Sequence, residues 1–598
     1  MKSCLLVALL LVTHAFADKA LIPRGADWKY LDDGTNPGAT WKAPAFDDSA
    51  WPSGKAPLGY GDKAGLGTEL HFGPDSGKKF ITSYFRRKFA IEAPGQVFGL
   101  RFNLRRDDGA VIYLNGHEVR RSGMPKGEIR HNTLARSTVA GAAETAWHAF
   151  SVNTDFLVAG ENVVAVEIHQ ASPSSSDIVF DLDLSIDSGT VTRGPYLQQM
   201  SDKGLIVRWR TSQAVVGVVR YGEAPYELGQ SASETQATTE HAVSIGGLAP
   251  SSTWFYSVGD PATTLAGGNP TYQFTTSPPP GGTSPSRIWI LGDCGTANQD
   301  QYAVRDAFRK FTAQRVPDVM LLLGDNAYNT GTDAEYQAAI FNTYPETLRR
   351  VPVWSTLGNH ETGQATDYDG KYPYFDIFTL PTAGEAGGVA SGTEHYYSFD
   401  RGQIHFICLD SMTANRSPDG AMATWLKADL ASTTATWLIA FWHHPPYTKG
   451  SHDSDLEPEL IEMRKNFLPI LEAGGVDMVL SGHSHCYERS FFLDGHYGDS
   501  KTLTAAMKKN AGSGRPAEGG AYAKPLSGTR SHKGAVYAVA GSAGKTSGGS
   551  LNHKAMFISL NQLGSLVLDV AGNRLDATFV HPEGSGFTTP DTFTILKK

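Results

Sequence analysis

Residues 319–328 read VMLLLGDNAY, an unbroken apolar run that ends abruptly at Gly324 and Asp325. A strand buried on both faces reads as a continuous apolar run, because neither face of its sheet meets water. In open α/β sheets, functional groups gather at the carboxyl ends of such strands. The run therefore predicts a central strand of an α/β sheet with a functional carboxylate at its end.

The same design recurs four more times, and each apolar run is followed at once by residues of the types that bind metals. The runs are RIWILGDCG (287–295), PVWSTLGNHE (352–361), TWLIAFWHHPPY (436–447) and VDMVLSGHSH (476–485). A single Gly-Asn-His or a lone histidine is more often a turn or a satisfied core residue. Five such runs in order are not expected by chance. We expect their carboxyl ends to converge in one crevice.

The residue types at these five strand ends define the chemistry. They offer two carboxylates, an amide, a phenol and several imidazoles. Oxygen and imidazole donors without thiolates favour iron, zinc or manganese over softer metals. One carboxylate can bridge two cations, and two cations about 3.5–4 Å apart suit displacement at phosphorus. Such cations also lower the pKa of a bound water enough to form hydroxide near neutral pH. The pattern therefore predicts a two-metal hydrolase.

The order GDxG, GDxxY, GNHE, a strand ending in His, and GHxH resembles that of the metallophosphoesterases, and most closely the purple acid phosphatases. The general superfamily pattern opens Asp-x-His, whereas this chain has Gly295 in place of that histidine and Tyr328 three residues after Asp325. A phenolate is a hard anionic donor suited to ferric iron, and in this family it causes the colour by charge transfer. The resemblance covers about residue 196 to the carboxyl terminus.

The resemblance implies a specific ligand set. Fe(III) would be held by Asp293, Asp325, Tyr328 and His485, and a second, divalent metal (Fe, Zn or Mn) by Asp325, Asn359, His443 and His483, with Asp325 as the bridge. We choose His443 because the first histidine of its run matches the strand-then-His-x-Pro pattern of the family. The adjacent His444 is expected to pack behind the ligands. The reaction implied is hydrolysis of phosphate monoesters at mildly acidic pH, with a metal-bound hydroxide as nucleophile.

Two further histidines complete the expected site. His360, within GNHE, resembles the phosphate-contacting histidine of the family, and His452 lies nine residues beyond His443, where the family places a second one. Either would stabilise the phosphoryl charge or protonate the leaving alkoxide. The alternative for His452 is a histidine in a mobile surface loop. Glu361 is expected to orient a metal ligand.

Upstream of this region the sequence predicts two β domains. Residues 18–188 contain short alternating runs separated by turn signals, for example at 84–90, 110–114 and 162–169. Its segments WKAPAFDDSAWPSGKAPLGYGD and DDGAVIYLNGHEV resemble galactose-binding-like jelly rolls of secreted enzymes. The domain would either bind a polysaccharide or serve as a spacer without a ligand.

Residues 191–278 predict a fibronectin-III-like β-sandwich. A stiff-then-flexible Pro-Gly linker follows it. Residues 285–598 are expected to form the α/β metallophosphoesterase domain, with two packed mixed sheets flanked by helices and with the C-terminal strands included. An amphipathic stretch at 301–314 predicts one of these helices.

The amino terminus reads as an export signal. Lys2 is followed by an apolar run from Leu5 to Val12, and small residues stand at the cleavage positions Ala15 and Ala17. Residues 1–17 are therefore expected to be a signal peptide, and the protein to be secreted or periplasmic. The alternative is a buried first strand. The run is too short to span a bilayer, and no later segment predicts an integral membrane span.

Composition narrows the class further. With 598 residues the chain exceeds one hydrophobic core, and its net charge of −9 with no long Lys/Arg run speaks against a nucleic-acid partner. Once Cys4 leaves with the signal, Cys294, Cys408 and Cys486 remain, and an odd number makes a disulfide scaffold unexpected.

Two alternatives to a phosphomonoesterase stay open. A phosphodiesterase acting on nucleotides or teichoic-type polymers would use the same metals, because pocket walls rather than ligands select between the two substrates. The other alternative is a carbohydrate-binding surface protein in which the jelly roll is functional and the phosphatase domain is degenerate. The complete set of metal-ligand residues argues against this alternative.

Overall fold

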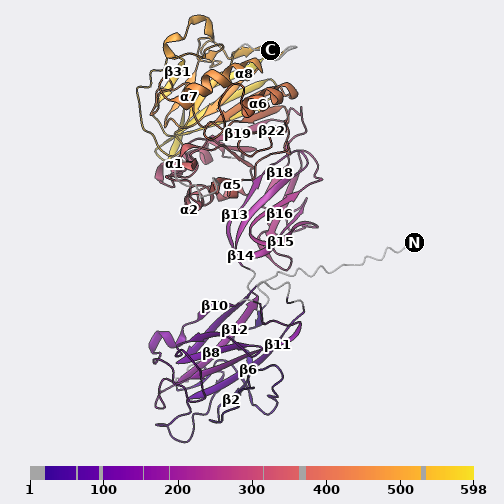
Figure 1. The fold of residues 1–598 in the computed structure, drawn as a ribbon, viewed down its shortest axis with the longest axis vertical. Helices are drawn as coiled ribbons and strands as arrows, with labels where there is room; N and C mark the ends of the chain where they lie inside the picture. Colours follow the sequence, from indigo (N-terminus) through magenta and orange to yellow (C-terminus); the bar gives the residue numbers. More distant parts are fainter. Residues whose placement is uncertain are drawn as a thin grey trace, which may run out of the picture. The chain divides into compact units, whose positions relative to one another are not determined.

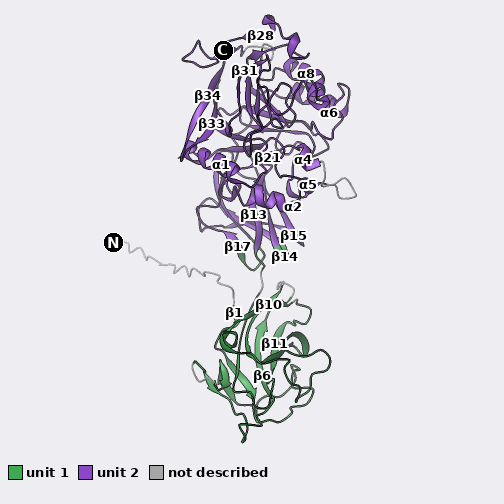
Figure 2. Ribbon diagram, turned by 90° about the vertical axis from the view of Figure 1, so that its left-hand side faces the viewer, with its two compact units in different colours: residues 1–190, 212–216, 259–265 green, residues 191–211, 217–258, 266–598 purple. Residues whose placement is uncertain are grey.

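The computed structural model describes residues 20–61, 65–92, 94, 99–152, 154–186, 189–313, 315–362, 372–526 and 534–598. The expected signal peptide and Cys4 lie outside these residues. The chain divides into two compact units, shown in Figure 2: unit 1 comprises residues 1–190, 212–216 and 259–265, and unit 2 comprises residues 191–211, 217–258 and 266–598. In the described part of the chain, no helix has the length and apolar character needed to cross a bilayer.

Unit 1 contains two six-stranded sheets (Figure 1), with a large hydrophobic core and a second, smaller cluster of buried residues that includes Trp41, Trp51 and Tyr113. The first sheet contains β1 (Ala20–Ile22), β4 (Leu58–Tyr60), β5 (Thr68–Glu69), β7 (Leu100–Asp107), β10 (His148–Val152) and β12 (Ile178–Ile186). The second contains β2 (Asp27–Leu31), β3 (Ser53–Lys55), β6 (Thr82–Ile91), β8 (Gly109–Leu114), β9 (His117–Ser122) and β11 (Gly160–His169). The strands predicted at 84–90, 110–114 and 162–169 are confirmed as parts of β6, β8 and β11. A short 3-10 helix, η2 (Gly141–Thr145), is also described in this region.

The next segment forms one six-stranded sheet with its own core. Its strands are β13 (Val191–Gln198), β14 (Leu205–Gly222), β15 (Gln230–Ile245), β16 (Thr253–Gly259), β17 (Thr264–Gly267) and β18 (Gln273–Thr275). Val207 and Trp209, two residues apart on β14, are both fully buried, as the period of two in a strand requires for one covered face. The jelly-roll and fibronectin-III names stay predictions.

Two seven-stranded mixed sheets form the rest of unit 2, as predicted. The first has the order β21 (Val353–Ser355), β20 (Val319–Leu322), β19 (Ser286–Leu291), β32 (Ser565–Ala571), β33 (Arg574–Glu583), β34 (Gly586–Lys597) and β29 (Tyr522–Lys524). The second has the order β22 (Tyr397–Arg401), β23 (Ile404–Cys408), β24 (Trp437–Trp442), β25 (Met478–Ser481), β30 (Val536–Ala540), β26 (Tyr487–Ser490) and β31 (Met556–Leu560). A two-stranded ribbon, β27 (Phe492–Leu493) with β28 (Lys508–Asn510), lies outside both.

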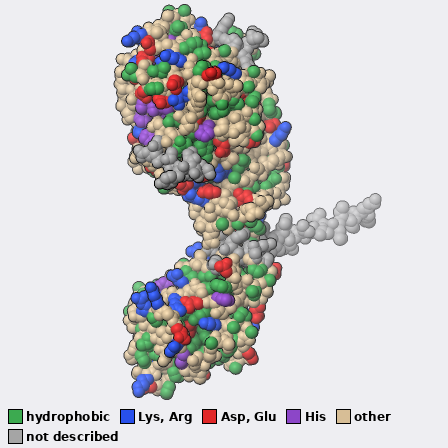
Figure 3. Space-filling model, in the orientation of Figure 1, with side chains coloured by type: hydrophobic (Ala, Val, Ile, Leu, Met, Phe, Trp, Pro, Cys, Tyr) green, Lys and Arg blue, Asp and Glu red, His purple; other side chains and the backbone are tan. Residues whose placement is uncertain are grey.

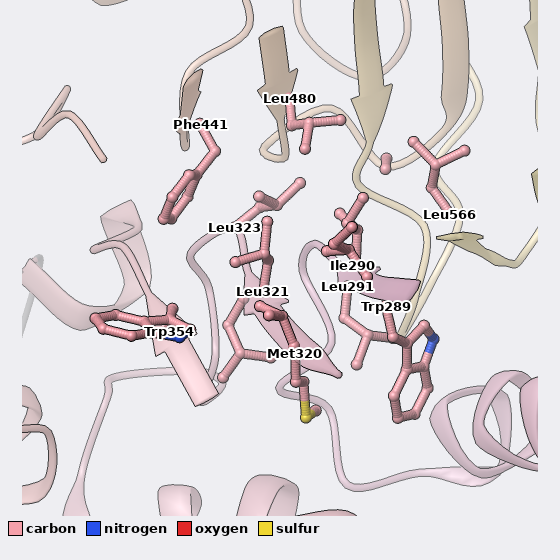
Figure 4. Packing of buried hydrophobic residues seen from close by; sticks show 14 of the residues in the cluster. Trp289, Ile290, Leu291, Met320, Leu321, Leu323, Trp354, Phe441, Leu480 and Leu566 are labelled. Atoms are coloured by element: carbon pink, nitrogen blue, oxygen red, sulfur yellow. The ribbon is translucent and has the colours of Figure 1, made fainter. Parts of the chain in front are cut away.

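The five apolar runs form neighbouring strands of these sheets, with β21 at the edge of the first sheet and β24 and β25 inside the second. β19, β20 and β21 are parallel neighbours, and so are β24 and β25, which places their carboxyl ends at common edges. β32 pairs antiparallel with β19, so the C-terminal strands complete the first sheet. Side chains of both sheets meet in one core, where Trp289, Leu321, Trp354 and Leu566 of the first sheet lie near Phe441 and Leu480 of the second (Figure 4).

Helices accompany the sheets of unit 2. They are α1 (Gln299–Thr312), α2 (Asp333–Tyr336), α3 (Pro345–Leu348), α4 (Asn359–Thr362), α5 (Pro373–Ile377), α6 (Ala421–Ser432), α7 (Pro458–Glu462), α8 (Leu468–Ala473), the π-helical turns η3 (Gln337–Phe341) and η4 (Met463–Phe467), and the 3-10 turns η5 (Ser500–Thr502) and η6 (Ala505–Met507). α1 confirms the predicted amphipathic helix and begins two residues earlier, because the Asn298 side chain caps it by accepting the Gln301 N–H.

Strand β23 carries a buried histidine between two carboxylates. His405 Nδ1 lies 2.7 Å from Asp400 Oδ1, and its Nε2 lies 2.8 Å from Asp429 Oδ2. Burial by itself would lower the pKa of His405, but the two carboxylates raise it to about 9. The folded protein therefore holds a proton here that the unfolded chain releases near pH 6.5. The resulting stabilisation is complete below pH 6.5 and is lost as the pH rises through 9.

We expect the free energy of unfolding to fall by up to about 3 kcal/mol between pH 6.5 and 9.5 through this group. His405→Gln should remove most of that pH dependence, which denaturant unfolding at several pH values measures. His581→Gln is the matched control, because His581 contacts only a backbone carbonyl, that of Leu563, among the hydrogen bonds described for it. A pH dependence that survives unchanged in His405→Gln would contradict the assignment.

Candidate metal centre

The proposed ligands stand directly beyond the buried strands, in backbone conformations that strands do not use. Asp293, Asp325 and His483 have φ of 55°, 50° and 65°, in the left-handed region that side chains other than glycine rarely adopt. Such strain persists only where the surrounding structure enforces it, and it clusters at functional sites. Here it turns the side chain away from the strand direction and into the space beyond the sheet.

The glycines of the motifs are needed because these turns pack against the ligands themselves. A Cβ on Gly324 would lie 2.5 Å from His443 Nδ1, and a Cβ on Gly358 would lie 2.2 Å from Asp325 Oδ1. Real Cβ atoms do not approach other heavy atoms so closely. Gly324 and Gly358, which precede Asp325 and Asn359, therefore let one strand end lie against the ligand of another.

The first group of donors surrounds the phenol of Tyr328. Its Oη lies 3.2 Å from Asp293 Oδ1, 3.0 Å from Asp325 Oδ2 and 3.3 Å from His485 Nε2. Burial, followed by the charges of Asp293 and Asp325, raises the pKa of Tyr328 well above its ordinary value. Three anionic or potentially anionic oxygens in one buried place are therefore unfavourable without a cation, and hard oxygen donors suit a trivalent one.

The second group consists of lone pairs that face one another. Asn359 Oδ1 lies 2.9 Å from His483 Nδ1 and 3.0 Å from His443 Nε2, and the two imidazole nitrogens are 3.1 Å apart. His443 Nδ1 donates to the Leu323 carbonyl at 2.9 Å, so in the neutral ring Nε2 carries a lone pair. Acceptors that converge in this way fit a cation placed between them.

Asp325 stands between the two groups. Its Oδ2 lies 3.0 Å from Tyr328 Oη in the first group, and its Oδ1 lies 3.5 Å from His443 Nε2 in the second. One donor atom each of Asp293, Asp325 and His443 lie within 4.8 Å of one another. One carboxylate thus offers an oxygen to each group, and the residues present fit a pair of metal ions.

The exchange of a histidine for Gly295 has a steric reason. A Cβ at this position would lie 2.3 Å from the Ala327 nitrogen, so no side chain fits here. The Gly295 carbonyl instead accepts the N–H of Tyr328 at 2.9 Å and helps to hold the phenol in the donor group. The two changes noted in the sequence are therefore parts of one local arrangement.

Glu361 lies against the turn that carries Asp325. It accepts the N–H of Asp325 at 2.9 Å, that of Gly358 at 2.6 Å and that of Asn326. Burial, followed by the charge of Asp325, raises the pKa of Glu361 to about 7. Glu361 therefore ties the turn that carries Asp325 to the turn that carries Asn359.

The two histidines expected to contact substrate flank the donors on different sides. His360 Nδ1 lies 2.7 Å from the Asn329 carbonyl, its Nε2 lies 3.9 Å from Asp325 Oδ2, and its ring centre is 4.4 Å from that of Tyr328. His452 stacks on His483 with ring centres 3.7 Å apart. His360 therefore borders the first donor group, and His452 borders the second.

His444 lies outside both donor groups. Its Nδ1 is 3.0 Å from Ser411 Oγ, and its ring packs 4.4 Å from that of His483. Of the two adjacent histidines, the structure brings His443 to the other donors and places His444 behind them. Cys294, Cys408 and Cys486 are free and buried, so the expectation of no disulfide scaffold is confirmed among the described residues.

Glu457 belongs to the site, although no motif in the sequence indicates it. Its Oε2 lies 2.9 Å from His452 Nδ1 and 3.5 Å from His483 Nε2. Burial by itself would raise the pKa of Glu457, but hydrogen bonds from His483, from the Asp453 N–H and from His452 lower it to about 2. The ionised carboxylate orients both imidazoles. A lone glutamate five residues after a histidine in a loop carries no sequence signal for this role.

On the face that Figure 3 draws, histidine side chains gather on unit 2. Comparison with known proteins agrees with the fold. Residues 286–487 match the calcineurin-like phosphoesterase family, and residues 195–276 match the N-terminal domain of purple acid phosphatases. By class, residues 286–487 thus resemble a metallophosphoesterase domain. Its similar curated relatives are purple acid phosphatases, and the two matched regions correspond to the N-terminal domain of that family followed by a phosphoesterase domain.

Purple acid phosphatase 15 of Arabidopsis thaliana is 30% identical over 279 residues, which are 42% of this chain and 49% of that protein. Purple acid phosphatase 18 of the same plant is 28% identical over 328 residues, 51% of this chain and 67% of that protein. The chain thus spans about half the length of the first relative. The structure of a purple acid phosphatase from yellow lupin (Lupinus luteus) seeds has a TM-score of 0.52 at 16% identity, covering 87% of this chain and 94% of that chain, which shows a shared fold.

Proposed function

We propose that this protein is a dinuclear-metal acid phosphatase that hydrolyses phosphate monoesters. The observation that carries the proposal is the position of Asp325, whose two oxygens face two separate donor groups. Two cations joined by one carboxylate are the arrangement that suits in-line displacement at phosphorus. A single structural metal would not need the second group of converging lone pairs.

The donor sets support two different metals. We assign Fe(III) to Asp293, Asp325, Tyr328 and His485, and a divalent Fe, Zn or Mn to Asp325, Asn359, His443 and His483. Phenolate and carboxylate oxygens favour a hard trivalent ion, whereas an amide and two imidazoles suit a divalent one. When bound, the two ions polarise the phosphoryl oxygens and activate a water for attack.

The protein side chains supply proton transfer and charge stabilisation. His360 is held at Nδ1 by the Asn329 carbonyl and His452 at Nδ1 by Glu457, so each ring has Nε2 left for the substrate. A histidine held at one nitrogen donates or accepts a proton at the other. We assign to these two histidines the stabilisation of charge on the phosphoryl oxygens and the protonation of the leaving alkoxide.

The remaining features are proposed with the same function. We assign residues 1–17 to a signal peptide, residues 18–188 to a galactose-binding-like jelly roll, residues 191–278 to a fibronectin-III-like domain and residues 285–598 to the catalytic domain. A secreted enzyme whose jelly roll holds it to a polysaccharide would act on phosphate esters near that surface. Glycan-array binding of residues 18–188 within the full chain would support the tether, and its absence would leave a spacer.

The decisive test combines activity with the visible spectrum. Protein purified without chelators and supplied with Fe and Zn or Mn should hydrolyse an aryl phosphate and absorb visible light. Tyr328→Phe should abolish the visible band, because charge transfer to iron requires the phenolate oxygen. Tyr302→Phe is the matched control, since the Tyr302 hydroxyl contacts the Ala297 carbonyl away from the donor groups.

Protein that contains these metals and hydrolyses no phosphate ester would overturn the proposed function. A preference for a bis-aryl over a mono-aryl phosphate would replace it with a phosphodiesterase that uses the same site. Hydrolysis by a colourless iron-loaded protein would retain the phosphatase and reject the iron–tyrosinate assignment.

A further inference from the structure

One connection lies against the first donor group from several sides. It is the segment 541–547, which follows β30. A Cβ on Gly541 would lie 2.9 Å from Asp293 Oδ2, and one on Gly544 would lie 2.6 Å from the Asp293 carbonyl oxygen. Both glycines therefore permit a close approach of this segment to Asp293. No motif in the sequence had marked it.

Two side chains of the segment reach two other members of the same group. Ser547 Oγ lies 2.8 Å from His485 Nδ1. Lys545 Nζ lies 3.9 Å from the centre of the Tyr328 ring. The segment thus contacts Asp293, Tyr328 and His485, which are all the proposed ligands of the first metal apart from the bridge.

The Lys545 ammonium is in an unusual electrostatic setting. It is half-buried, and within the described part of the chain it makes no ion pair with a carboxylate. Lys449, also near the centre, is by contrast paired with Asp453 at 2.8 Å and Asp455 at 3.1 Å. The face of Tyr328 is therefore the partner that the structure describes for the charge of Lys545, and a cation is attracted to such a face.

We propose that Lys545 is a positioning residue of the first donor group. It stabilises the phenolate of Tyr328 as a metal ligand and sets the energy of the charge-transfer absorption of that phenolate. The inference rests on the proposed function. Lys545 contacts the ring of the proposed ligand Tyr328. The segment 541–547 therefore serves the first donor group rather than the substrate.

The physical reason is the direction in which charge moves. Absorption in the visible band transfers an electron from the phenolate ring toward the metal and leaves the ring less negative. A cation over the ring lowers the energy of the ring electrons and so opposes the transfer. With Lys545 in place the band should lie at shorter wavelength than in a protein without that charge.

Ser547 supports the same first donor group through its contact with the ring of His485. If Nδ1–H of His485 donates to Ser547 Oγ, Nε2 carries the lone pair and faces Tyr328 Oη at 3.3 Å. Partners of this kind fix the orientation of a metal-binding histidine, and their loss weakens metal binding by about 10- to 100-fold. Lys545 and Ser547 therefore act on neighbouring ligands of one metal.

The experiment compares Lys545→Met, Lys545→Arg and the control Lys554→Met in the full-length, metal-loaded protein. Lys554 is an exposed lysine of the same region. We expect Lys545→Met to shift the visible band to longer wavelength by roughly tens of nanometres and to speed loss of iron to a chelator about tenfold. Loss of the second metal should change less. Lys545→Arg keeps the charge and should restore both properties, and Lys554→Met should leave them unchanged.

Each outcome separates the inference from the proposed function. A coloured wild type with the same band and the same iron loss in Lys545→Met would overturn the inference alone. An unshifted band with a raised KM would show that Lys545 binds substrate, which also overturns it. A colourless iron-loaded wild type would overturn the iron assignment and the inference together. Equal unfolding midpoints for the Met and Arg variants exclude misfolding as the cause of a shift.

Discussion

Asp325→Ala is expected to empty both halves of the metal centre and to lower the rate of phosphate-ester hydrolysis at least about 10³-fold. Its carboxylate reaches Tyr328 Oη with one oxygen and His443 Nε2 with the other, so each metal would lose a ligand at once. Each metal stabilises the transition state by several kcal/mol, and about 4 kcal/mol already corresponds to this loss in rate. Metal content and kcat/KM on an aryl phosphate measure the two effects.

The matched control for this substitution is Asp306→Ala. Asp306 lies on α1 with half its side chain exposed, at 49%, and pairs with Arg305 away from the donors. It should retain both metals and full activity. If Asp325→Ala still bound two metals per chain, the bridging role would be wrong, and the two donor groups would have to bind their ions independently.

Asp591→Ala is expected to destabilise the catalytic domain by about 3–5 kcal/mol, the cost of leaving a buried charge without its partner. Asp591 on β34 and Arg489 on β26 form a two-armed ion pair of 2.6 and 2.9 Å, and both side chains are 0% exposed. Tyr487 Oη adds a hydrogen bond to Asp591 at 2.8 Å. Because β34 and β26 belong to different sheets, the pair also joins the two layers.

Denaturant unfolding should show this loss as a lower transition midpoint. Asp576→Ala on the neighbouring β33 is the control, because its pair with Arg574 is exposed and is expected to contribute within about 1 kcal/mol. The double variant Arg489→Met with Asp591→Leu should recover much of the stability, since an apolar pair of similar volume avoids the unpaired charge. A single variant as stable as the wild type would refute the assigned role.

Much of the fold and the centre follows from contiguous residues. The run 319–328 predicts a buried strand with a ligand at its end, and Asp325 lies just beyond β20. The apolar run and the ligand are adjacent in the chain, so their relation survives folding. The paired change at Gly295 and Tyr328 was visible because each residue lies within a motif that the resemblance identifies. The steric exclusion of a side chain at 295 was not, because it depends on the position of Ala327 after the turn has formed.

The residues that support the proposed ligands and the substrate histidines escaped prediction, because they are isolated residues on loops. Glu457, Lys545 and Ser547 belong to no periodic run and to no motif. Ser547 is 62 residues from the histidine it contacts, and Asp591 is 102 residues from Arg489. Nothing in the local pattern of either partner identifies the other.

The identity of the ligand types, the central strands that present them and the α/β class were therefore readable from the order of residues alone. The resemblance already favoured His443 over His444 and Asp325 as the bridge. Only the three-dimensional arrangement decided the distances at which Asp325 offers one oxygen to each group, and that Glu457 holds His452. Apolar runs and motifs are properties of neighbours in the chain, and they are already present before folding. Hydrogen bonds, shifted pKa values and converging lone pairs depend on distances between groups far apart in sequence, which exist only once the two sheets have packed.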